Sequence, residues 1–210
     1  MKIVGVVGGI GSGKSFFTYH LKSLGACSIN ADRLAHDILT FPEIMDQMSS
    51  RWRGLLPSLD EYDAPEVNDA FPGLLRASVS AIVFDNPEEL AFLQSILFPV
   101  IDKRLQESIA RYHPNYTNVL ILDAPLLYEA EWDVYCNFVV FIDTPLETRI
   151  QNASNRTNGK QLSEADLLKR EAVQLSLEKK QKYAKFTIKN HGTKEEFQKE
   201  IEKFWANIND

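Results

Sequence analysis

The residues with the clearest chemical potential form the segment Gly8-Gly9-Ile10-Gly11-Ser12-Gly13-Lys14-Ser15, which satisfies the pattern G-x-x-x-x-G-K-[ST]. Glycines allow backbone N–H groups to turn inward around phosphate oxygens, because no Cβ obstructs them. Lys14 can then bridge the β- and γ-phosphates of a nucleoside triphosphate, and the Ser15 hydroxyl can bind Mg²⁺. The segment therefore predicts a P-loop that binds ATP or a similar triphosphate. The predicted nucleotide contacts in this part of the chain are Gly9, Ile10, Gly11, Ser12, Gly13, Lys14, Ser15 and Phe16.

Such a loop needs a buried strand before it and a helix after it, and the flanking residues predict both. Residues 2–8 are apolar on both faces, as in a strand that lies under helices in a parallel sheet. From about residue 13 to residue 24, apolar side chains recur at helical spacing, and Gly25 supplies a C-terminal stop. The start of this helix adds unpaired N–H groups and the positive end of its dipole to the anion site.

Two other interpretations of the glycine tract fit less well. A glycine-rich turn with a chance lysine and serine would not need the flanking strand and helix. The dinucleotide-binding pattern G-x-G-x-x-G requires no lysine after its last glycine, and it places an acid at the end of the second strand. Here Lys14 follows Gly13, and no acid stands at the corresponding position of the second strand. The segment thus favours a nucleoside triphosphate.

The rest of the chain alternates predicted strands with helical patterns, which indicates an α/β fold. We expect a P-loop three-layer α/β/α architecture with a central, mostly parallel five-stranded sheet, a helical substrate lobe and a small helical lid. Further strands are predicted at residues 27–30, 119–123, 138–143 and 186–190, and further helices at 87–112, 146–156 and 194–208. The expected parts are a nucleotide-binding core (1–39, 113–156 and 184–210), a helical lobe (40–112, with an exposed excursion at 54–73) and a polar lid (157–183).

Two acids follow predicted strands at the carboxyl edge of the sheet, where open α/β folds bind ligands. Asp32 comes just after the second strand and could orient or deprotonate an acceptor hydroxyl; it could also simply stabilise a helix N-terminus. Asp123 ends the strand "VLILD" and could reach Mg²⁺ directly or through water, or be a plain strand-end carboxylate. Arg156, which ends a helix that leads into a polar insert, could close onto phosphates or remain a solvated cation.

Composition narrows the class of protein. The 210 residues carry a formal net charge of −6, which argues against a nucleic-acid partner, and no apolar tract approaches the length needed to cross a bilayer. Cys27 and Cys136 are expected to be reduced thiols, and the four histidines share no metal-ligand spacing. We therefore expect a cytoplasmic protein, a monomer or weak homo-oligomer, whose partner is a small molecule.

Several blocks together resemble the dephospho-CoA kinase family: "GGIGSGKS", "NADRLAHDI", "IVFDNPEELAFLQSILFP", "LDAPLLYEA" and "REAVQLSLEKKQKYAKFTIKNHG". They run in family order across nearly the whole chain. The first is generic to P-loop proteins, but the combination is specific. The resemblance implies ATP- and Mg²⁺-dependent phosphorylation of the 3′-hydroxyl of dephospho-CoA, the last step of coenzyme A biosynthesis.

The resemblance also implies roles for individual residues. It makes Lys14, Asp32 and Arg156 catalytic, with Asp32 as the base, while Ser15 and Asp123 stay the metal ligands predicted from the residue pattern. It adds Asn190 to the nucleotide contacts. The acceptor contacts that it implies are Asp32, Arg76, Pro125 and Leu126, and Arg170, Gln174 and Lys180 match the lid and C-terminal pattern.

The chain departs from the family pattern at several positions: Val7 and Phe16 where threonine is usual, Asn30 for the first acid of D-x-D, Phe98 for the histidine of H-P, Asn152 for the earlier lid arginine, and Lys185 for the aspartate of A-D. Losing a hydroxyl, a histidine or an arginine could each cost about 1 kcal/mol or more of transition-state binding. Two alternatives therefore stay open: a kinase for another nucleotide or small alcohol, and an ATP-binding homologue with reduced catalysis.

Overall fold

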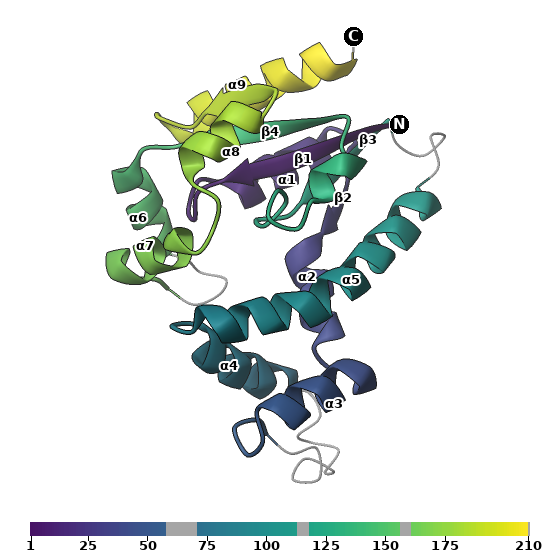
Figure 1. The fold of residues 1–210 in the computed structure, drawn as a ribbon. Coiled ribbons are helices and arrows are strands. Elements are labelled where there is room, and N and C mark those ends of the chain that lie inside the picture. The colour runs from purple at the N-terminus through teal and green to yellow at the C-terminus, as the bar shows by residue number, and fades with distance from the viewer. Residues whose placement is uncertain (58–70, 113–117, 156–160, 210) are drawn as a thin grey trace. The chain divides into compact units, whose positions relative to one another are not determined.

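The computed structural model describes residues 1–57, 71–112, 118–155 and 161–209. These residues form two compact units, one made of Met1–Ala31 with Ser108–Asp210 and the other of Asp32–Glu107. Along the chain the elements are β1 (Lys2–Gly8), α1 (Lys14–Ser23), β2 (Cys27–Asn30), α2 (Ala31–Ile38), α3 (Pro42–Arg51), α4 (Phe71–Val83), α5 (Pro87–Arg111), β3 (Val119–Asp123), the 3₁₀ turn η2 (Trp132–Tyr135), β4 (Phe138–Asp143), α6 (Leu146–Ser154), α7 (Glu164–Ala172), α8 (Leu177–Tyr183), β5 (Phe186–Lys189) and α9 (Lys194–Asn209) (Figure 1).

The first unit contains a five-stranded sheet in the order β2-β3-β1-β4-β5. All four strand pairs are parallel, which confirms the predicted sheet and makes it fully rather than mostly parallel. β1 lies in the middle, with Val4 opposite Ile121 of β3 and opposite Phe138 of β4. Because parallel strands all end at the same edge, this topology brings the residues after β1, β2, β3 and β4 to one edge of the sheet.

Helices cover both faces of the sheet, as the three-layer prediction requires. Side chains alternate between the faces of β1, so Val4 and Val6 pack with α1 and α9 while Gly5 approaches Leu127 and Val139 on the other face. The buried residues of α9 recur at helical spacing: Phe197, Ile201, Phe204 and Ile208. α8 also contacts β1 and β4, but none of its residues belongs to the apolar cluster that α1 and α9 form with Val4 and Val6. α8 therefore covers the other face of the sheet. Burial of these apolar faces is the main favourable term that holds the layers together.

The second unit is helical, from α2 to most of α5. Its core includes Ile44, Met48, Leu75, Leu93 and Leu97, all of them buried. α4 begins at Phe71, so the end of the excursion expected at 54–73 is helical in this structure, and residues 58–70 lie outside the described part. Among the described residues, no helix combines the length and the apolar character needed to span a membrane.

Candidate active site

The segment Gly8–Ser15 runs from the last residue of β1 through a loop into the first turn of α1, as predicted. Gly13 is the N-cap of α1 with a φ of 94°, and Gly11 has a φ of 77°. Residues with a Cβ rarely adopt these left-handed conformations, which explains the glycines at these two positions. A Cβ on Gly11 would in addition lie 2.2 Å from the carbonyl oxygen of Arg149. The loop therefore has its conformation fixed by glycine and by the close approach of α6.

Three side chains hold the loop from outside through its carbonyl oxygens. Thr144 Oγ1 donates to the Ser12 carbonyl at 2.9 Å, Asn190 Nδ2 donates to the same carbonyl at 3.0 Å, and Asn152 Nδ2 donates to the Gly11 carbonyl at 2.8 Å. Since the N–H and C=O groups of a peptide unit point in opposite directions, the Ser12 carbonyl held in this way turns the Gly13 N–H to the other side, while the Ser12 N–H donates to the Gly9 carbonyl at 3.2 Å. These contacts fix the loop in a conformation of the kind that binds anions.

The ammonium group of Lys14 folds back over this loop. Its Nζ donates to the carbonyl oxygens of Gly8 at 2.6 Å and Gly9 at 2.8 Å. The adjacent Ser12 hydroxyl is buried and has no hydrogen-bond partner among the described residues. A buried hydroxyl without a partner is costly, and a phosphate oxygen is the kind of acceptor that would satisfy it.

A hollow of about 430 Å³ lies beside the loop. Phe16 stacks on Phe197 with ring centroids 5.6 Å apart, and Lys194 Nζ lies 5.3 Å from the centroid of the Phe16 ring. The hollow is lined by Gly11, Ser12, Gly13, Lys14, Ser15, Phe16, Thr148, Asn152, Asn190, Gly192, Lys194 and Phe197. Apolar ring surface next to the N–H groups of a glycine-rich loop suits a nucleoside phosphate.

Asp123 ends β3 at the same sheet edge as the loop. It is only 8% exposed, pairs in register with Val6 of β1 and Asn30 of β2, and accepts a hydrogen bond from Asn30 Nδ2 at 3.4 Å. A carboxylate and the Ser15 hydroxyl are hard oxygen ligands of the type that Mg²⁺ prefers, so these residues fit the metal predicted from the sequence. Within the described residues, no group of three or more His, Cys, Asp and Glu forms a metal site of the all-protein kind.

One ion pair at the loop was not foreseen from the sequence. Glu171 of α7 places Oε1 2.5 Å from Nη1 of Arg149 on α6, and the same oxygen accepts a hydrogen bond of 2.7 Å from the backbone N–H of Ile10. Both side chains are nearly buried, at 7% exposure for Arg149 and 14% for Glu171. The only sequence signal for Arg149 was its place three residues before Asn152, which puts the two on the same side of a helix.

A second buried network fixes the segment after β3. Lys180 Nζ contacts Glu129 Oε1 at 3.0 Å, the Pro125 carbonyl oxygen at 2.8 Å and Gln174 Oε1 at 3.0 Å. The carboxylate of Glu129 also accepts from the backbone N–H of Leu175 at 2.7 Å. Lys180 is fully buried. The structure therefore gives Gln174 and Lys180 a role in positioning Pro125 and the following Leu126.

Two further predicted residues belong to the second unit. In the second unit, Asp32 stands in the first turn of α2, and Arg76 of α4 lies 3.3 Å from Nδ1 of His36. Since a guanidinium only donates, His36 Nδ1 must be the acceptor in this contact. Burial lowers the pKa of His36, the Arg76 cation lowers it further, and the carboxylates of Asp32 and Asp37 act in the opposite direction. Arg156, predicted to be catalytic, lies outside the described residues.

Comparison with protein families identifies the family of this chain. A sequence model of dephospho-CoA kinase matches residues 2–196. The chain belongs to the dephospho-CoA kinase family. A dephospho-CoA kinase of Carboxydothermus hydrogenoformans is 32% identical over 203 residues, which are 96% of this chain and 91% of that protein. Among solved structures, TT1252 from Thermus thermophilus has a TM-score of 0.73 at 26% identity (99% and 97% of the two chains), and the dephospho-CoA kinase from Campylobacter jejuni has 0.60 at 25% (99% and 97%).

Several departures from the dephospho-CoA kinase pattern now have a structural description. Asn30 keeps a contact with Asp123, and Asn152 holds the loop through Gly11. Val7 is fully buried within the sheet, where it adds to the core. With these three residues present, Lys14 Nζ still lies over the loop and Gly11 and Gly13 still have left-handed conformations. These three departures therefore leave the predicted phosphate loop in place.

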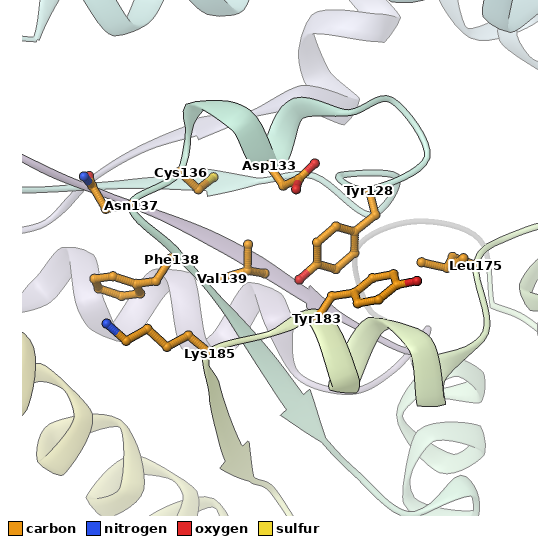
Figure 2. Close-up of a pocket in the computed structure, with 9 residues that line it drawn as sticks. All are labelled: Tyr128, Asp133, Cys136, Asn137, Phe138, Val139, Leu175, Tyr183 and Lys185. Carbon is orange, nitrogen blue, oxygen red and sulfur yellow. The ribbon is translucent and has the colours of Figure 1, made fainter.

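The departure at Lys185 belongs to a different hollow of about 650 Å³, lined by Tyr128, Asp133, Cys136, Asn137, Phe138, Val139, Leu175, Tyr183 and Lys185 (Figure 2). Lys185 Nζ lies 5.6 Å from the centroid of the Phe138 ring, and the rings of Tyr128 and Tyr183 meet edge to face at 5.6 Å. Phe138 begins β4, whereas the P-loop follows the end of β1. In a parallel sheet, the start of one strand and the end of its neighbour lie at opposite ends of the sheet. Lys185 therefore does not take part in the predicted phosphate site.

Proposed function

We propose that this protein transfers the γ-phosphate of ATP to the 3′-hydroxyl of the ribose in dephospho-CoA, which yields coenzyme A and ADP. The observation that carries the proposal is the intact P-loop, with Gly11 and Gly13 in left-handed conformations and Lys14 over the loop, in a chain matched by the dephospho-CoA kinase family from residue 2 to residue 196.

In this proposal the loop positions the triphosphate rather than taking part in covalent chemistry. Phosphoryl transfer passes through a loose transition state, so catalysis depends on position and on compensation of negative charge. The N–H groups of residues 9–15 and the start of α1 hold the phosphate oxygens, and the Lys14 ammonium moves from the Gly8 and Gly9 carbonyls onto the β- and γ-phosphates. Phe16 and Asn190 border the nucleoside in the adjoining hollow.

Mg²⁺, when bound, would neutralise charge on the β- and γ-phosphates. Ser15 and Asp123 are the residues that would hold it, because both supply hard oxygen atoms at the phosphate edge of the sheet. We assign the alignment or deprotonation of the acceptor hydroxyl to Asp32 and the stabilisation of the migrating phosphoryl group to Arg156. Arg76, Pro125 and Leu126 complete the acceptor contacts in this proposal.

The parts of the chain have matching proposed roles. Residues 40–112 form the acceptor lobe, residues 157–183 form the lid, and the remaining segments form the nucleotide-binding core. The compact helical unit Asp32–Glu107 supports a separate acceptor lobe. We further propose that the protein acts in the cytoplasm as a monomer or weak homo-oligomer and that it uses no nucleic-acid partner, as its net charge of −6 favours.

The direct test incubates the purified protein with Mg-ATP and dephospho-CoA and follows both products, ADP by a coupled assay and coenzyme A by mass spectrometry. The Lys14→Ala variant, which keeps the loop glycines, should lose about 10²- to 10³-fold in kcat/KM. Formation of no more coenzyme A by the wild type than by the variant would refute the proposal. A screen of other nucleotides and small alcohols would then identify the acceptor.

A further inference from the structure

The P-loop already holds an oxyanion that belongs to the protein itself. Glu171 Oε1 accepts a hydrogen bond of 2.7 Å from the backbone N–H of Ile10, which is one of the N–H groups expected to hold phosphate. The same oxygen lies 2.5 Å from the guanidinium of Arg149. A backbone N–H of a glycine-rich loop together with a guanidinium is the donor set that binds phosphate oxygens. Glu171 therefore occupies a position with the chemistry of a phosphate subsite.

This pair lies directly against the loop. A Cβ added to Gly9 would lie 2.5 Å from Arg149 Nη1 and 2.8 Å from Glu171 Oε1, so the charged ends of both side chains lie against the backbone of Gly9. The Lys14 ammonium contacts the carbonyls of Gly8 and Gly9, immediately before Ile10. Since the lysine of a P-loop reaches the β- and γ-phosphates, Glu171 occupies the end of the loop that serves these phosphates.

The Arg149 side chain has donor capacity that Glu171 does not use. Its Nε is buried and has no hydrogen-bond partner among the described residues, although the guanidinium carries five N–H donors. A buried guanidinium that serves only to anchor α7 would be expected to have its donors satisfied. A phosphate group offers three oxygens in place of the single carboxylate oxygen that contacts Arg149 here.

We propose that Arg149 is a phosphate-binding residue of this protein and that Glu171 holds its place in the absence of nucleotide, so that the terminal phosphates of ATP bind by displacing the Glu171 carboxylate. The inference rests on the proposed use of ATP but not on the identity of the acceptor. Two anions cannot share one N–H and one guanidinium at low cost, because like charges a few ångströms apart in a site shielded from water repel strongly. Glu171 thus competes with ATP, while Arg149 serves both.

The test measures binding of ATP, ADP and AMP by calorimetry, with Mg²⁺ present and no acceptor. Glu171→Gln keeps the side-chain volume and removes the charge, and it should tighten ATP binding about tenfold because the competing anion is gone. Arg149→Met should weaken ATP binding by about tenfold or more. AMP has no β- or γ-phosphate, so its affinity should be the same in both variants and the wild type.

The opposite signs of the two effects distinguish this proposal from a purely structural ion pair. If the pair only anchored α7 to the loop, either substitution would loosen the site and weaken binding of all three nucleotides. That result, or unchanged ATP affinity in Glu171→Gln, would overturn the proposal. Glu200→Gln, which breaks an exposed ion pair with Lys203 on α9, is the matched control and should leave ATP affinity unchanged.

Two further measurements keep the result interpretable. Thermal unfolding confirms that each variant is folded, and Arg149→Lys replaces Arg149→Met if the latter is not. A lysine retains the charge but loses the planar fork, so Arg149→Lys should still bind ATP more weakly than the wild type and bind AMP equally well. Because no acceptor is present, a failed dephospho-CoA assay together with the predicted binding changes would refute the proposed acceptor and leave this inference standing.

Discussion

The ammonium nitrogen of Lys180 lies 3.0 Å from a carboxylate oxygen of Glu129, and the lysine side chain is almost completely buried. The same ammonium group also contacts the Pro125 carbonyl and Gln174 Oε1, so three oxygens replace its hydration shell. This contact joins α8 to the segment that follows β3. The stability of that segment, which holds two proposed acceptor contacts, depends on a charge pair rather than on apolar packing alone.

Removal of one partner should therefore destabilise the protein strongly. We expect Lys180→Met to lower the free energy of unfolding by about 3–5 kcal/mol, because Glu129 is left buried without its counter-charge. The double variant Lys180→Met/Glu129→Gln should recover part of this loss. Lys203→Met, which breaks an exposed pair, should cost less than about 1 kcal/mol. Urea unfolding measures all three, and a similar small loss for both lysine variants would contradict the importance of the buried pair.

Asp123 should set the metal requirement of catalysis. In the dephospho-CoA assay we expect Asp123→Asn to lower kcat by about 10²-fold and to raise the Mg²⁺ concentration needed for half-maximal rate, because an amide is a weaker ligand than a carboxylate. Asp143→Asn is the matched control, since Asp143 ends β4 in the same way but pairs with His191 at 2.8 Å. Equal effects of the two substitutions would mean that Asp123 is only a strand-end carboxylate.

His36 should titrate below its ordinary pKa of 6.5, chiefly because burial disfavours the imidazolium and secondly because Arg76 is adjacent. NMR titration of His36 in Arg76→Met should show a pKa closer to 6.5 than in the wild type. A pKa that does not respond to Arg76→Met would contradict the contact.

The same shift predicts a direction for stability. As the pH falls below about 6.5, the unfolded chain takes up a proton at His36 before the folded protein does, so this residue makes the free energy of unfolding fall on acidification. His36→Asn should reduce that slope. Urea unfolding at a series of pH values, with the wild type beside the variant, provides the measurement.

Cys136 should be an unreactive thiol. Burial, with a smaller contribution from the Asp133 carboxylate, raises the pKa of Cys136 to about 12. At pH 8 in a Cys27→Ser background, alkylation by iodoacetamide should be about 10³-fold slower in the folded than in the urea-unfolded protein, because the thiolate is the reactive form. Mass spectrometry follows the reaction. Equal alkylation rates in the folded and unfolded protein would show that the fold neither shields the Cys136 thiol nor raises its pKa.

The sequence alone determined the parts of this protein that depend on neighbouring residues. The P-loop, the strand before it and the helix after it are contiguous, so glycine positions and apolar spacing were enough to predict them. The same holds for the α/β alternation. The position of Asp123 at the same sheet edge as the P-loop could also be predicted, since the strands of a parallel sheet have their carboxyl ends at one edge.

Only the tertiary structure revealed the contacts between distant segments. Ile10 and Glu171 meet across 161 residues of sequence, and Lys180 and Pro125 meet across 55. Neither contact follows from a local pattern, because each depends on the strand order β2-β3-β1-β4-β5 and on which helix covers which face of the sheet. Arg149 looked like any polar residue of an amphipathic helix. Its burial with the guanidinium against the backbone of Gly9 in the P-loop is what makes it a candidate for phosphate binding.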